Sequence, residues 1–138
     1  MKTKRIIWHH SAAESPTPQF AAINDWHKAR TFPKSSLGYF VGYHYVIEKD
    51  GSVIQARVDT EIGAHDTGEN LDSIGICLVG DFTNSRPTFE QEISFALLLR
   101  QLMLKYNISV NSIEPHRRDD NTDCPGKSMP ENWALGLL

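Results

Sequence analysis

The fold of this chain is decided by a near-continuous apolar run in its middle, Ser73-Ile74-Gly75-Ile76-Cys77-Leu78-Val79. A strand with one face in water alternates apolar and polar residues, whereas an apolar run without alternation is typical of a strand covered on both faces. We therefore expect residues 73–79 to form an interior strand of a sheet that has other elements packed on each side.

A β-hairpin is predicted upstream of this run. Aromatic and β-branched residues at 43–49 and 52–55 flank the dipeptide Asp50-Gly51. A two-residue Asp-Gly between such segments is typical of a tight hairpin turn. The segment 60–72 that follows is rich in glycine and polar residues, so we expect it to be a loop.

A long helix is predicted downstream of the run, over about residues 88–106. Its first residues, Thr88-Phe89-Glu90-Gln91, have the form of a capping box, in which the side chains of the first and last residue cap backbone N–H groups. The residues expected to supply its broad apolar stripe include Phe89, Ile93, Ala96, Leu97 and Met103.

A second helix is predicted over about residues 18–30. Thr17-Pro18 is a suitable start, since threonine can cap a helix and proline is tolerated at its first position. Phe20, Ile23 and Trp26 or His27 then recur at helical spacing, so one face is expected to be buried, with Trp26 in the core. A short strand at 5–9, a loop from 107 and a short helix after Pro130 complete the predicted elements.

Together these elements predict an α/β fold with a mixed central β-sheet flanked by α-helices. The length of 138 residues suits one domain, so residues 1–138 are expected to form a single unit. The fold should have a hydrophobic core that needs no disulfide staples.

Charge and hydropathy exclude several classes of protein. The net charge is −3 without a basic stripe, which argues against a nucleic-acid partner. No apolar run approaches the roughly 18 residues of a membrane span, so stable membrane insertion is not expected. The apolar stretch Ile6-Ile7-Trp8 is too short for a signal peptide. We therefore expect cytoplasmic synthesis without a signal peptide.

The histidine and cysteine residues of this chain are its best candidates for binding a catalytic metal ion. His9 and His10 end the first predicted strand, and His116 and Cys124 lie in a polar loop. Two histidines and one thiolate are a suitable ligand set for a catalytic zinc ion. Neighbouring strand residues point to opposite faces, so His9 and His10 should not both be ligands. For each histidine a hydrogen-bonded packing role stays open, as does a disulfide between Cys77 and Cys124, although free or metal-bound thiols are expected.

The whole chain resembles the zinc-dependent N-acetylmuramoyl-L-alanine amidases, a family that includes phage amidase lysozymes and peptidoglycan recognition proteins. The likeness spans residues 7 to 126 in the order of the family. It rests on six segments: Ile7-Trp8-His9-His10-Ser11-Ala12, Trp26-His27-Lys28, Gly42-Tyr43-His44-Tyr45-Val46-Ile47 with Asp50-Gly51, Ile62-Gly63-Ala64-His65, Ser73-Ile74-Gly75-Ile76-Cys77-Leu78-Val79-Gly80, and His116 with Thr122-Asp123-Cys124-Pro125-Gly126.

The resemblance implies hydrolysis of the amide between N-acetylmuramic acid and L-alanine in peptidoglycan, the expected partner, with Zn²⁺ as cofactor. It implies that His9, His116 and Cys124 bind the zinc ion. Tyr43 matches the catalytic tyrosine, which would stabilise negative charge on the carbonyl oxygen, and Thr122 would orient the water or the carbonyl. His65 matches a residue lining the substrate groove.

Departures from the pattern of the family bear on the role of the enzyme. Phage lysozymes often carry a lysine where this chain has Thr122, and wall-recycling relatives carry a glutamate where it has Cys77. The missing glutamate disfavours a recycling role. We expect a phage- or prophage-type endolysin that acts on the cell wall after release, with His27 and His44 as structural residues. The alternatives are a non-catalytic peptidoglycan-binding recognition module and a protein with a purely structural zinc; no oligomeric state is assigned.

Overall fold

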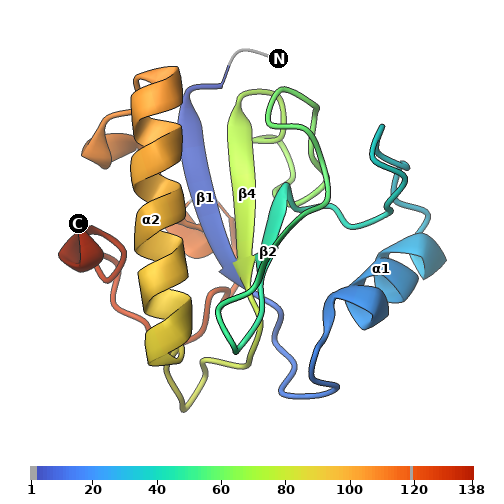
Figure 1. Ribbon diagram of the computed structural model, residues 1–138, viewed down its shortest axis with the longest axis horizontal. Coiled ribbons are helices and arrows are strands. Elements are labelled where there is room, and N and C mark those ends of the chain that lie inside the picture. Colours follow the sequence, from blue (N-terminus) through green and yellow to red (C-terminus); the bar gives the residue numbers. More distant parts are fainter. Residues whose placement is uncertain (1–2, 119) are drawn as a thin grey trace.

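The computed structural model describes residues 3–118 and 120–138, and its centre is a five-stranded mixed sheet of order β3-β2-β4-β1-β5 (Figure 1). The elements in chain order are β1 (Arg5–His10), α1 (Phe20–Ala29), β2 (Tyr45–Ile47), β3 (Val53–Gln55), β4 (Ser73–Leu78), α2 (Phe89–Tyr106) and β5 (Ile113–Pro115). β4 and β1 pair in parallel with each other and with their outer neighbours β2 and β5, whereas β2 and β3 form the antiparallel hairpin. This arrangement confirms the predicted α/β fold with a mixed sheet.

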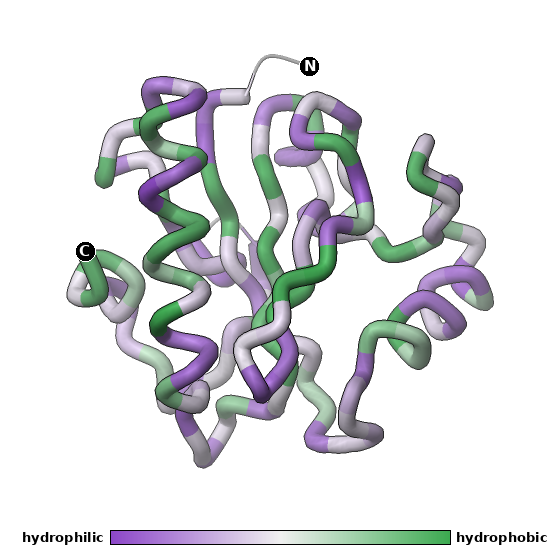
Figure 2. Tube along the Cα trace, in the orientation of Figure 1, coloured by the Kyte–Doolittle hydropathy of each residue, from purple (hydrophilic) through white to green (hydrophobic). Residues whose placement is uncertain are grey.

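The apolar run in the middle of the sequence is the central strand of the sheet. All six residues of β4 are buried, and the strand lies between β1 and β2. Figure 2 shows hydrophobic residues following β1 and β4 through the middle of the molecule. Burial of both faces explains why these segments lack alternation.

Two hydrophobic clusters cover the two faces of the sheet. One joins Trp8 of β1 and Ile76 of β4 to α2, and the other joins Cys77 of β4 to Ile23 of α1. Because successive strand residues point to opposite faces, His9 and Cys77 lie on the α1 face while Trp8 and Ile76 pack under α2. The imidazole of His9 and the thiol of Cys77 therefore both lie on the α1 face.

Helix α2 begins as predicted but buries a different set of residues. The capping box is present, with Thr88 accepting from the Gln91 N–H and the Gln91 side chain accepting from the Thr88 N–H. The residues that face the sheet are Gln91, Phe95, Leu98, Leu99 and Leu102. Phe89, Ile93 and Leu97, which were predicted in the buried stripe, are exposed. Apolar residues occur on more than one side of this helix, so helical spacing alone did not identify the face that packs.

Helix α1 is capped by a residue that is distant in the sequence. It begins at Phe20 and lacks a side-chain cap of its own, so the Thr17 cap that was predicted does not form. The buried carboxylate of Glu48 instead accepts from the backbone N–H groups of Gln19 and Phe20 at 2.8–3.0 Å. A carboxylate at this end also interacts favourably with the helix dipole. The prediction that Trp26 is a core residue is wrong, because it is 41% exposed.

The hairpin turn is one residue longer than predicted. Glu48 and Ser52 are joined by a backbone hydrogen bond, which leaves Lys49, Asp50 and Gly51 in the loop. Gly51 has a φ of +88°, as expected for the left-handed residue that closes a three-residue hairpin loop. Within the described part of the chain, no helix is long and apolar enough to cross a membrane.

Candidate active site

Sheet register brings His9 and His116 together. β1 and β5 are parallel, and Trp8 lies opposite Pro115, so the next residues along the two strands are His9 and His116. Their rings are 4.5 Å apart between centroids. The carboxyl ends of parallel strands are common sites for ligands in such sheets. The prediction of a loop over residues 113–115 was wrong, because they form β5, and this pairing is not evident without that strand.

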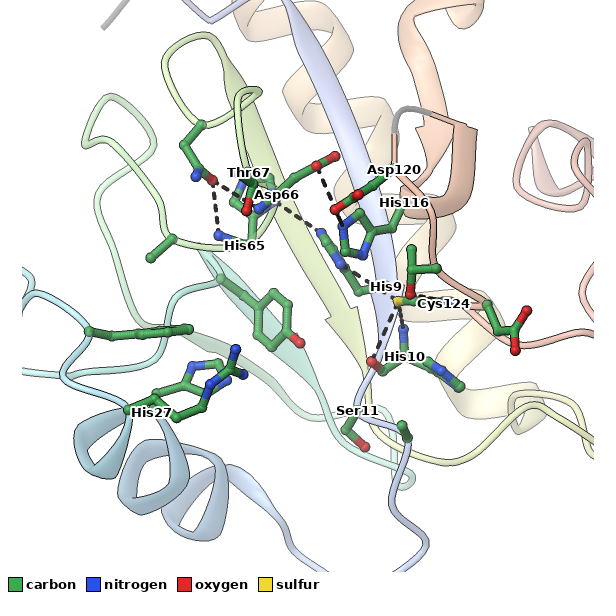
Figure 3. A pocket seen from close by; sticks show the side chains of 18 of the residues that line it. His9, His10, Ser11, His27, His65, Asp66, Thr67, His116, Asp120 and Cys124 are labelled. Atoms are coloured by element: carbon green, nitrogen blue, oxygen red, sulfur yellow. Dashed lines mark hydrogen bonds and ion pairs between the residues drawn. The ribbon is translucent and has the colours of Figure 1, made fainter.

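Cys124 completes a group of three potential metal ligands. One ligand atom from each of His9, His116 and Cys124 lies within 4.8 Å of the others (Figure 3). Cys124 Sγ is 3.7 Å from His9 Nδ1. Ligands at about 2.3 Å (sulfur) and 2.1 Å (nitrogen) from one tetrahedral zinc ion lie roughly 3.6 Å apart, so this pair suits zinc. Among the described residues no fourth histidine or cysteine joins the group.

His10 faces away from this group, as strand alternation predicts. Its Nδ1 accepts from the Phe82 N–H at 3.1 Å, and its ring lies beside that of Phe82. Phe82 belongs to the hydrophobic cluster under α2. His10 also lines the cleft and its backbone contacts Cys124 Sγ, but His9 is the histidine whose ring nitrogen lies near that sulfur.

The three potential ligands lie in a cleft of about 760 Å³, a volume within the usual range for ligand sites. The cleft is also lined by Tyr43, His65 and Thr122, so every site residue predicted from sequence reaches it. Further lining residues that the sequence analysis did not single out include Arg30, Phe32, Asp66 and Asp120. These residues belong to no local motif, and only the fold brings them to the cleft.

Tyr43 lies beside His9, with 5.0 Å between the ring centroids. Burial, together with the nearby thiols of Cys77 and Cys124, raises the pKa of the Tyr43 hydroxyl well above its ordinary value. The hydroxyl is therefore protonated at neutral pH and can donate a hydrogen bond. A protonated hydroxyl at this place in the cleft can donate a hydrogen bond to a molecule bound there.

The ionisation of these potential ligands bears on metal binding, because a metal ion binds a neutral imidazole and a deprotonated thiol. Burial, reinforced by His65 and His116, lowers the pKa of His9 well below its ordinary value, so its ring is neutral at neutral pH. Burial raises the pKa of the Cys124 thiol to about 12. A metal ion binds the thiolate, so binding would release a proton from Cys124. His116 Nε2 lies 3.4 Å from the buried carboxylate of Asp66 and 3.5 Å from the exposed carboxylate of Asp120.

Thr122 orders the loop that presents the cysteine. Its Oγ1 accepts from the Cys124 N–H at 3.2 Å. A hydroxyl that accepts through its oxygen still carries a proton to donate. The residue therefore has the means to support the Cys124 loop and to contact a molecule in the cleft.

His44 and His27 were predicted as structural residues. His44 is fully buried, and its Nδ1 accepts from the Gly75 N–H while its Nε2 pairs with the Glu61 carbonyl, in agreement with that prediction. His27 also accepts a backbone hydrogen bond, from Gly42 N–H to Nδ1 at 2.8 Å. Its ring also lines the cleft, 5.5 Å from that of Tyr43 between centroids, and its structural role stays a prediction.

His27 should make folding stability depend on pH. Burial, with smaller effects of Arg30 and Arg57, lowers the pKa of His27 from 6.5 to about 4. Between pH 6.5 and about 4 the unfolded chain binds a proton on His27 that the folded protein does not bind. The free energy of unfolding therefore decreases as pH falls through this range. His27→Asn keeps an acceptor for Gly42 N–H but has no group that titrates in this range. Between about pH 7 and pH 4.5, we expect its free energy of unfolding to fall by about 1–2 kcal/mol less than that of wild type. Urea unfolding of chelator-treated proteins measures this difference, and equal losses would contradict it.

Comparisons with known proteins find relatives that match most of this chain. The family model for N-acetylmuramoyl-L-alanine amidase matches residues 1–127. The chain is 31% identical over 143 residues to the endolysin of Enterobacteria phage T3, covering 99% of this chain and 89% of the endolysin. It is 30% identical over 125 residues to peptidoglycan-recognition protein SC2 of Drosophila melanogaster, covering 89% and 68% of the two chains. The solved structure of an N-acetylmuramoyl-L-alanine amidase from Clostridium intestinale URNW matches with a TM-score of 0.81 at 33% identity, covering 94% of this chain and 80% of that one.

Proposed function

Because this chain belongs to the N-acetylmuramoyl-L-alanine amidase family, we propose that it is an amidase whose zinc ion is held by His9, His116 and Cys124. Its activity is hydrolysis of the amide between N-acetylmuramic acid and L-alanine in peptidoglycan, which its amidase and endolysin relatives support. The observation that carries the zinc proposal is the convergence of these three ligand atoms at the cleft.

The ligand set fits a catalytic zinc ion. Two imidazoles and one thiolate are typical zinc ligands, and a set of three leaves a coordination position for the reaction. A zinc ion bound there supplies Lewis-acid activation of water and of the amide carbonyl at neutral pH. A structural zinc normally has four protein ligands, and the described residues offer three histidine or cysteine ligands in this group.

Two residues of the cleft are assigned direct roles in the reaction. The Tyr43 hydroxyl, kept protonated by burial, donates to the carbonyl oxygen of the scissile amide as negative charge develops there. The Thr122 hydroxyl donates a hydrogen bond to the water or to the carbonyl, and its oxygen accepts one from the Cys124 N–H. Substrate contact by His65 stays a prediction, because its ring lines the cleft but is only 8% exposed.

In the biological role that we propose, the enzyme is an endolysin that digests the wall after release from the cytoplasm. Endolysins of several phages are among its relatives. The competing role is that of a recognition module that binds wall fragments without cutting them, since recognition proteins are also relatives. The three ligands together with Tyr43 favour the enzyme, because binding alone needs no site for activated water.

Digestion of purified peptidoglycan tests this function. Wild-type protein should release stem peptides that begin with L-alanine, identified by mass. Treatment with a chelator should stop the release, and added zinc should restore it, because the reaction requires the metal ion. Binding of wall fragments without any release would instead support the recognition module.

A further inference from the structure

The His9 imidazole is the first member of a row of hydrogen bonds that leads away from the cleft. Its Nε2 lies 2.9 Å from Nδ1 of His65. Nε2 of His65 lies 3.2 Å from the hydroxyl of Ser73, and that hydroxyl donates to the Glu69 carbonyl at 2.6 Å. Figure 3 shows His65 approaching His9 from the side opposite Cys124. His65 and Ser73 are both buried.

The carbonyl at the end of this row sets the direction of every hydrogen bond in it. A carbonyl oxygen can only accept, so the Ser73 proton points to Glu69 and the Ser73 oxygen accepts from His65 Nε2–H. A neutral His65 with its proton on Nε2 has a lone pair on Nδ1, which accepts from His9 Nε2–H. The remaining lone pair of His9 is then on Nδ1, the atom that lies 3.7 Å from Cys124 Sγ.

Two glycines make room for the His65 ring. A Cβ atom at Gly75 of the central strand would lie 2.5 Å from His65 Cγ, and one at Gly63 would lie 2.6 Å from His65 Cδ2. Contacts this short are not tolerated, so any side chain at either position would displace the ring. The glycine in the middle of β4 therefore has a specific consequence, since it lets an imidazole lie flat against the strand within reach of His9.

We propose that His65 and Ser73 are positioning residues that hold His9 in the tautomer whose Nδ1 faces the metal. This inference rests on the proposed function, because it assumes that His9 is a zinc ligand. A ligating histidine commonly donates its other N–H to a partner that fixes the tautomer and the ring orientation. Here the partner is a second imidazole, whose own proton is directed by Ser73 and the Glu69 carbonyl. His65 thus acts through His9 and needs no contact with peptidoglycan.

The pair His65→Asn and His65→Leu tests the proposal with the full-length protein. The two side chains are nearly the same size, but asparagine offers an oxygen acceptor close to the position of Nδ1 and leucine offers none. We expect His65→Leu to weaken zinc affinity by about 10–100-fold, measured by competition with a chromophoric chelator, and His65→Asn to restore most of it. The visible spectrum of the Co²⁺-substituted protein should change in His65→Leu only. Equal loss of affinity in both variants, or no loss in either, would overturn the proposal.

Histidine ¹⁵N shifts of metal-free wild-type protein give a readout that needs no zinc. His9 and His65 should both carry their proton on Nε2, and Ser73→Ala should weaken this preference because it removes the acceptor for His65. The Nδ1–H tautomer of His9 would overturn the positioning role. A wild-type protein that binds no zinc would refute the proposed function and this inference together. If wild type binds zinc and is an active amidase, but His65→Leu and His65→Asn have the same zinc affinity, the positioning role alone is refuted.

Discussion

Cys124→Ala is expected to lose bound zinc and, with it, the release of peptides from peptidoglycan. The substitution removes one of three ligands, and the remaining His9 and His116 cannot complete the set that the metal requires. Loss of an outer-shell partner already costs about 10–100-fold in affinity or activity, so loss of a ligand should cost more than about 100-fold. Metal analysis of the purified protein and the mass-scored wall digestion measure the two effects.

The second cysteine supplies a matched control for this experiment. Cys77 is fully buried on β4 opposite His9, outside the group of ligand atoms. Cys77→Ala should therefore keep stoichiometric zinc, although it removes a thiol of the same kind. A Cys124→Ala protein that still holds zinc as tightly as Cys77→Ala would mean that this thiolate is no ligand.

Tyr43→Phe is expected to keep zinc and to lower turnover by about 10²–10³-fold. The Tyr43 hydroxyl is protonated at neutral pH, because burial raises its pKa well above the ordinary value. Removal of one donor to a developing oxyanion typically costs about 2.7–4 kcal/mol, which corresponds to this loss. Initial rates of peptide release, with zinc content measured on the same sample, test the prediction.

Tyr45, the first residue of β2, is a control two residues further along the chain. Its hydroxyl donates to Asp59, and its ring packs against the cluster under α2, on the other face of the sheet from Tyr43. Tyr45→Phe removes the same oxygen without touching the cleft, so its turnover should stay near that of wild type. Unchanged turnover in Tyr43→Phe would remove Tyr43 from the mechanism, and loss of zinc would place it among the groups that support the metal.

Much of the fold could be predicted because local patterns encode it directly. The unbroken apolar run of β4 requires cover on both faces, and the capping box at Thr88 satisfies its own helix N-terminus. The edge strand β5 was missed because its three residues carry no periodic signal and end in proline. The length of the hairpin loop depended on the left-handed conformation of Gly51, which suits both turn types.

The ligand set His9, His116 and Cys124 was predicted through resemblance to a family, and strand alternation separated His9 from His10. Sequence alone offered no reason for the ligands to meet. For His9 and His116 that reason is the parallel register of β1 with β5, which depends on hydrogen bonds between segments more than a hundred residues apart. Cys124 reaches them from a loop, and its Sγ accepts from the His10 N–H.

The sequence by itself therefore determined the buried central strand, the capped long helix and the residue types suited to zinc, because each depends on neighbours along the chain. Only the tertiary structure decided which face of α2 packs, that Glu48 caps α1, and that Gly75 gives His65 the space to reach His9. These features depend on distance in space, since a hydrogen bond or a close contact forms only after the sheet has brought remote segments together.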